Sequence, residues 1–136
     1  MLKYGIACSL NETSTRSPIV LRGPIEKLCE EASSLGYQGL EIQLADPMQY
    51  DWKQIKKVCS DYHLELTAFA TGRELSENGL CLLSDDAAVR RAAIQRLKEH
   101  IDCAQTAGCQ VIVGQARLPR YRTTTSDAMP TSCCAR

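Results

Sequence analysis

The spacing of apolar residues along the chain changes repeatedly between about two, which is typical of strands, and about 3.6, which is typical of helices. Four short apolar segments are predicted to be strands, at residues 3–8, 39–43, 65–71 and 111–113. Three amphipathic segments between them are predicted to be helices. Strands that alternate with helices favour right-handed crossovers and a parallel sheet, so the pattern predicts an α/β fold.

Turn and capping residues indicate where the helices begin and end. Pro24 is expected at the first position of the first helix, and Gly36 ends it. Asp51 is expected to cap the second helix, and Ser84 opens a long third one. The stripe that this third helix buries is predicted to contain Val89, Ala93, Leu97, Ile101 and Ala104.

One sequence pattern occurs twice, each time where a predicted helix leads into a strand. Residues 32–40 and 104–112 both read A-x-x-x-G-x-Q-x followed by an aliphatic residue, 72 positions apart. The glycine in each copy is placed to end its helix. The repeat therefore marks the ends of two similar helix-to-strand units.

The connections that follow strands are long, whereas those that follow helices are about three residues. The long connections are residues 9–23, 44–50 and 72–84. Enzymes with parallel sheets place their active sites in the loops at the carboxyl ends of the strands. We therefore expect any functional site at that end of the sheet.

The second strand carries two polar residues that alternate with aliphatic ones. Leu40 and Ile42 suit the side that helices cover, so Glu41 and Gln43 are expected to point into a barrel or crevice. A carboxylate there is costly unless it is paired or close to water. This favours a functional role for Glu41, with a structural hydrogen-bonding role as the alternative.

Composition and charge exclude several classes of protein. The 136 residues include 16 Lys and Arg against 16 Asp and Glu, so no net charge favours nucleic acid or an anionic membrane as partner. No apolar run is long enough for a signal peptide or a membrane span, which indicates a cytoplasmic protein.

Six of the eight cysteines are scattered without CxxC spacing, and we expect Cys8, Cys29 and Cys59 to be buried as small apolar residues.

The histidines and one charged loop are weaker candidates for chemistry. His63 and His100 are predicted to have surface or capping roles, because neither is spaced with another ligand as HxH or HxxxH. Arg73, Glu74 and Glu77 are placed in a strand-to-helix loop. They could close over a substrate, although polar residues are common in loops of this kind.

Several spaced segments together resemble one family. Residues 35–42 (LGYQGLEI) are similar to the second strand of the xylose isomerase-like TIM barrel family, the sugar phosphate isomerases and epimerases. Residues 70–72, 78–80, 84–94 and 111–114 are similar to its third strand, third helix and fourth strand. The resemblance covers about residues 3–118. It implies a partial (β/α)8 TIM barrel, with about four parallel strands and three helices in residues 1–118.

The resemblance implies that the full-length protein is a metal-dependent aldose-ketose isomerase or ketose 3-epimerase. Such enzymes move a proton beside a carbonyl with two carboxylates and a divalent metal, here expected to be Mn, Mg or Co in the full-length family. The family's metal ligands come from the second half of the barrel and have no counterpart here, so no catalytic residue and no metal ligand is predicted. The residues expected to contact a sugar or sugar phosphate are Glu41, Gln43, Thr71, Gly72, Gly114 and Gln115.

Residues 119–136 show neither the apolar spacing of a strand nor that of a helix and are rich in Ser and Thr. This predicts an irregular, disordered or aberrant tail. We therefore expect a truncated sugar isomerase or epimerase that is inactive alone. One alternative is a non-catalytic half-barrel that acts only by associating with another chain, including a second copy, through exposed sheet edges. Another is an endonuclease IV-type DNA repair protein, against which the balanced charge counts.

Overall fold

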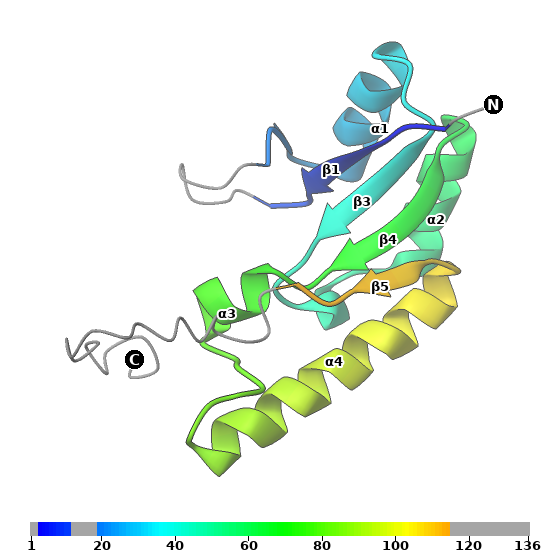
Figure 1. Cartoon of the computed structure of the whole chain (residues 1–136). Helices are drawn as coiled ribbons and strands as arrows, with labels where there is room; N and C mark the ends of the chain where they lie inside the picture. Colours follow the sequence, from blue (N-terminus) through cyan, green and yellow to red (C-terminus); the bar gives the residue numbers. More distant parts are fainter. Residues whose placement is uncertain (1–2, 12–18, 115–136) are drawn as a thin grey trace, which may run out of the picture.

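The computed structural model describes residues 3–11 and 19–114. These residues form one five-stranded sheet in the order β2-β1-β3-β4-β5, and neighbouring strands run parallel. Figure 1 shows the sheet backed by α1, α2 and α4, with α3 at the end to which the strand arrows point. The predicted α/β class is confirmed, and the arrangement is that of a partial barrel.

The elements follow the predicted alternation closely. The four longer strands are β1 (Gly5–Ser9), β3 (Gly39–Gln43), β4 (Glu65–Ala70) and β5 (Gln110–Ile112). The three predicted helices are α1 (Ile25–Ser34), α2 (Trp52–Asp61) and α4 (Ala87–Ala107). The four strands lie side by side in sequence order, as the pattern predicts.

Three short elements lie in connections that were predicted to be irregular. They are β2 (Leu21–Arg22), a 3-10 helix η1 (Pro47–Gln49) and the helix α3 (Arg73–Asn78). Each is only a few residues long, so neither apolar period has room to appear in the sequence. The long connections at the carboxyl ends of the strands are therefore partly ordered.

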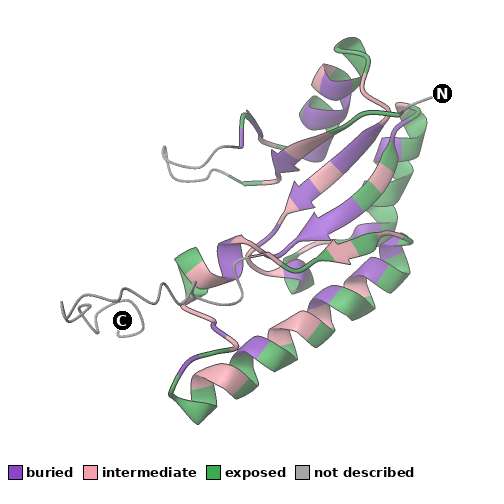
Figure 2. Ribbon diagram, in the orientation of Figure 1, coloured by how far each residue is buried: buried purple, intermediate pink, exposed green. Residues whose placement is uncertain are grey.

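The core lies between the sheet and the helices. Leu40 and Ile42 of β3 and Leu28 of α1 are completely buried there, and Ile55 of α2 and Ala104 of α4 are nearly so. Burying an aliphatic side chain of this size contributes about 1.5–3 kcal/mol. Figure 2 shows this pattern as buried residues on the sheet and on the inner sides of the helices.

Capping residues form the helix ends largely as predicted. The Asp51 carboxylate accepts hydrogen bonds from the amides of Lys53 and Gln54 at 3.0 and 3.1 Å. The first and third helices differ slightly, because Pro24 is the residue before α1 and Asp86, rather than Ser84, caps α4. These are shifts of one or two residues within the predicted turns.

The buried side of α4 differs from the predicted stripe. Ala93 and Ala104 are buried as expected, but Ile101 is 57% exposed and its neighbour His100 is completely buried. The surface or capping role expected for His100 is therefore wrong, whereas His63 is exposed as predicted. The apolar pattern alone could not show that a histidine faces inward, because its partner lies elsewhere in the sequence.

Candidate functional site

Glu41 and Gln43 lie on the face of β3 opposite the helices, because Leu40 and Ile42 between them enter the core. The Gln43 side-chain amide donates a hydrogen bond of 2.7 Å to the Glu41 carboxylate. Both side chains are partly exposed. The predicted orientation of the pair is confirmed, and the hydrogen bond shows how the carboxylate is accommodated on this concave face.

Thr71, Gly72 and Gly114 meet at the carboxyl ends of β4 and β5. The Gly114 amide donates to the Thr71 hydroxyl at 3.2 Å, and a side-chain carbon added to Gly114 would lie 3.6 Å from the Gly72 Cα. A carbon added to Gly72 would lie 3.7 Å from the Gln43 side-chain oxygen. Gly72 therefore joins this cluster to the pair on β3.

Five of the six predicted substrate-contacting residues thus lie together at one end of the sheet. The sixth, Gln115, lies outside the described residues, as does the predicted tail 119–136. Thr71 is 1% exposed and its hydroxyl is used by Gly114, so it shapes the cluster from within. The side chains that remain partly open to solvent are Glu41 and Gln43.

Helix α3 anchors this end of the sheet through one arginine. The Arg73 guanidinium donates to the Ser9 hydroxyl at 2.7 Å and to the Gln43 carbonyl at 3.3 Å. It also pairs in a bidentate manner with Glu77, at 2.6 and 2.9 Å. Arg73 is buried and joins the ends of β1 and β3 to α3, so it is not available to close over a substrate, a role that the sequence left open for it.

Glu74 and His100 form a buried pair between α3 and α4. The carboxylate of Glu74 lies 2.6 Å from the His100 Nε2, and the two side chains are 6% and 0% exposed. The second Glu74 oxygen accepts from the Asn78 amide at 3.2 Å. The pair fixes α3 against α4, and Glu74, like Arg73, is therefore not available to close over a substrate.

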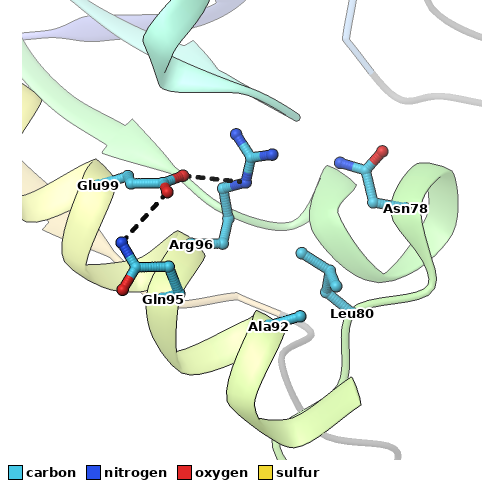
Figure 3. Close-up of a pocket in the computed structure, with 6 residues that line it drawn as sticks. All are labelled: Asn78, Leu80, Ala92, Gln95, Arg96 and Glu99. Carbon is cyan, nitrogen blue, oxygen red and sulfur yellow. Dashed lines mark hydrogen bonds and ion pairs between the residues drawn. The ribbon is translucent and has the colours of Figure 1, made fainter. Parts of the chain in front are cut away.

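A hollow of about 350 Å³ lies between α3 and α4 (Figure 3). Its lining includes Arg96, whose guanidinium contacts carboxylates of Asp46, Glu74 and Glu99. Burial tends to raise the pKa of Asp46, but hydrogen bonds from the Met48 amide and from Arg96 outweigh it and hold that pKa below its usual value. Because carboxylates already surround Arg96, the hollow offers no free cation to an anionic ligand.

Four of the six described cysteines are buried, and Cys103 and Cys109 are partly buried. Burial raises the pKa of Cys8 to about 12, which keeps it a neutral thiol. Cys29 of α1 and Cys59 of α2 are also buried, with their sulfurs 3.8 Å apart. The hydrogen bond to Cys59 raises the pKa of Cys29, and burial adds to the effect. The buried position predicted for these three cysteines is confirmed.

Residues 3–11 and 19–114 contain no set of side chains placed to bind a metal ion. There, no group of three or more His, Cys, Asp and Glu side chains is placed to hold a metal ion. Glu41 lies beside an amide rather than beside further carboxylates or imidazoles. The described residues do not fit the divalent metal that the fold family implies.

A helix that crosses a membrane must be long and apolar. None of the helices in the described ranges is both long and apolar enough to cross a bilayer. The longest is α4, which carries Arg, Lys, Glu and Asp residues along its length.

With the barrel-like sheet and its polar concave end established, the chain can be placed among known proteins. The family model described as xylose isomerase-like TIM barrel matches residues 29–133, which is most of the chain. The chain belongs to this family. A comparison with curated proteins finds no match.

Among solved structures, the chain is similar to D-psicose 3-epimerase crystallised in the presence of D-fructose. The TM-score is 0.60 at 17% sequence identity, and the match covers 82% of this chain but 37% of that one. At this identity the likeness shows the fold alone. The chain spans well under half of the length of this structural relative.

Proposed function

We propose that this chain is the amino-terminal part of a sugar isomerase or epimerase barrel, and that its concave end contributes part of the substrate-binding surface. The observation that carries this is the convergence of polar and glycine residues at the carboxyl ends of three neighbouring strands. Membership of the xylose isomerase-like family supports it, because the fold family places its sites at this end. The proposed contacts are Glu41, Gln43, Thr71, Gly72, Gly114 and Gln115.

The chemistry of this surface fits a sugar or sugar phosphate. A sugar hydroxyl both donates and accepts hydrogen bonds, the Glu41 carboxylate accepts them, and the Gln43 amide can do either. Gly72 and Gly114 present backbone without side chains, which allows a ligand to approach closely. The balanced charge of the chain does not favour nucleic acid, and we propose a cytoplasmic location.

We propose further that the chain is inactive alone. Interconverting ketoses and aldoses requires a base close to the acidic carbon and an electrophile on the adjacent oxygen, each contributing orders of magnitude in rate. In the full-length family a Mn, Mg or Co ion would supply the electrophile. Glu41 and Gln43 supply at most one of these two groups.

The test of inactivity is exchange of substrate protons with deuterated solvent. Ketohexoses are incubated with the chain and added manganese, magnesium or cobalt, and no exchange above the protein-free control is expected. Stereospecific exchange that is lost in Glu41→Gln would overturn this proposal, because it would mean that the first part of the barrel assembles a working site.

The test of binding is an NMR titration of the labelled chain with ketohexoses and their phosphates. We expect weak binding, with shifts confined to the amides of Gly72 and Gly114 and the side chain of Gln43. Gln43→Ala should abolish the shifts, and Gln54→Ala on α2 is the matched control. Shifts that persist in Gln43→Ala, or none at all in the original chain, would contradict the proposed surface.

A second candidate is a non-catalytic half-barrel that acts only through association with another chain. The observation that favours it is exposed apolar surface on the last helix and strand. Ile94 and Ile101 of α4 are 47% and 57% exposed, and Ile112 and Val113 at β5 are 46% and 58% exposed. The two candidates are compatible, since association concerns the edge of the sheet and sugar binding its concave end.

A further inference from the structure

The described part of the molecule exposes a set of apolar side chains at one edge of the sheet. We call Ile94, Ile101 and Val113 the open flank; Ile112 is exposed as well but faces the concave side, because it pairs with Ala70, which pairs with Gln43. The two α4 residues lie seven positions apart, on one side of the helix, with the partly buried Leu97 between them. The 3-10 helix η1 lies against the other side of α4, where the Met48 sulfur is 3.8 Å from the Cys103 sulfur. Apolar residues gathered in this way on a soluble domain are typical of an interaction surface.

We propose that the open flank docks against a second copy of this chain, with α4 and β5 of one copy beside α1 and β1 of the other. This rests on the proposed function, in that it takes the chain to be part of a barrel. Each copy provides four parallel strands of three to six residues, β1, β3, β4 and β5. Two copies therefore provide the eight parallel strands that close a (β/α)8 barrel.

The charges of the two helices are complementary. Helix α4 carries four Arg and Lys against one Glu and one Asp, whereas α1 carries three Glu against one Lys. Arg91 and Lys98 of α4 are exposed, as are Glu26 and Glu30 of α1. Opposite charges favour a contact of α4 with α1 of the other copy and disfavour a contact between two α4 helices.

The strand edges allow the same arrangement. Among the described residues, β2 pairs only with Cys8 and Ser9 of β1, so the edge of β1 at residues 5–7 has no strand beside it. Beyond β5 there is likewise no described strand. A twofold axis along the barrel would keep all strands parallel and use both edges of each copy, so the assembly would close at two chains.

The test is sedimentation equilibrium of the full chain over a range of concentrations. We expect a dimer whose dissociation constant rises at least about tenfold in Ile94→Lys/Ile101→Lys, because each lysine places a charge in the contact. The matched control is Met48→Lys, which adds a charge at an apolar residue that is 63% exposed on η1 and should leave the dimer unchanged. Circular dichroism and urea unfolding of each variant check that the monomer still folds.

Charge reversal tests which helices meet. Lys98→Glu alone should weaken the dimer, and Lys98→Glu combined with Glu30→Lys should restore it. A monomer at every concentration would overturn the proposal, and so would a dimer that the flank variant leaves intact or a growing series of larger species.

The sugar titration repeated on the Ile94→Lys/Ile101→Lys variant separates this proposal from the proposed function. Loss of the dimer with unchanged sugar shifts supports the docking surface and leaves the binding surface standing. A dimer that binds no sugar would support the docking surface and contradict the proposed substrate-binding role.

Discussion

The two helix-to-strand units that share one sequence pattern have the same turn but bury the residue after it differently. In both, the amide after the helix-ending glycine donates to the carbonyl of the first alanine of the pattern, at 3.0 Å from Tyr37 to Ala32 and from Cys109 to Ala104. Both glycines, Gly36 and Gly108, have positive φ angles of 81° and 74°. The local sequence therefore specifies the turn in each unit.

The difference appears three residues after the turn, in the strand that follows. Leu40 is completely buried in the core, whereas Ile112, its equivalent in the second unit, is 46% exposed. Ile112 pairs with Ala70, which pairs with Gln43 on the concave face. A shift of one residue in a strand moves each side chain to the other face. Which face a residue occupies is thus decided by pairing with distant strands and not by the pattern itself.

The largest effect is expected within the second unit, where His100 is buried and Ile101 is exposed. His100→Ala removes a fully buried ring and leaves Glu74 without its partner, so it should lower the free energy of unfolding by about 3 kcal/mol. Ile101→Ala should change it by less than about 0.5 kcal/mol in the monomer. Urea unfolding at low protein concentration measures both changes in free energy. Similar losses of stability in the two variants would mean that α4 is rotated about its axis, so that it does not bury His100 in preference to Ile101.

The next largest effect concerns Gly39, which begins β3. A side-chain carbon added there would lie 2.6 Å from the Thr67 Cγ2 and 3.2 Å from the Glu65 carbonyl oxygen. Gly39→Ala should therefore cost about 1–3 kcal/mol. Thr67→Ser removes that methyl group, so the double variant should recover part of the loss. An unchanged midpoint in Gly39→Ala would mean that β3 and β4 are less closely packed.

A smaller effect tests the shared turn. Gly36→Ala and Gly108→Ala each force a residue with a side chain into a left-handed conformation, at a cost of about 1 kcal/mol. The added carbon meets nothing within 4 Å at Gly36, and at Gly108 it meets only the mobile end of Lys56. Thermal unfolding should give similar losses for the two variants. A much larger loss at one position would show that the two turns are not equivalent.

The smallest effect concerns the ion pair that joins α4 to the residues after β3. The pKa of Asp46 is lower in the folded chain than its usual 3.8, so its stabilising contribution is present above about pH 4 and is lost as the pH falls through the folded value. Asp46→Asn should cost less than about 1 kcal/mol at pH 7. Urea unfolding of the two proteins should converge as the pH is lowered toward 3. A difference that does not change with pH would exclude the ion pair as its cause.

The sequence predicted the parts of the fold that depend on local periodicity and capping. The four longer strands, the three longer helices and the position of Glu41 and Gln43 on the concave face are confirmed, because alternation and turn residues determine them within a few positions. Helix α3 and the burial of His100 were missed. Their cause is a set of polar contacts, such as that of Glu74 with His100, between residues 26 positions apart.

The candidate site could be predicted only in part for the same reason. Family resemblance and strand alternation predicted that Glu41, Gln43, Thr71, Gly72 and Gly114 belong to one site, and these residues do lie together. The sequence places Arg73 in a strand-to-helix connection but does not show that it is a buried anchor, since its partner Ser9 lies 64 positions away. No pattern in a single sequence signals a pairing over such a distance.

The contacts of Arg73 also bear on how the chain folds during synthesis. One guanidinium group joins β1, β3 and the start of α3, so the carboxyl ends of these strands are tied together once about the first 80 residues have left the ribosome. Chains generally fold from the amino terminus as they emerge, and exposed strand edges make partly folded species prone to aggregation. The polar rim of the sheet can thus form before α4 is made. If the carboxyl ends of β1 and β3 are held together early, strands that are synthesised later can pair with a sheet edge that is already in place.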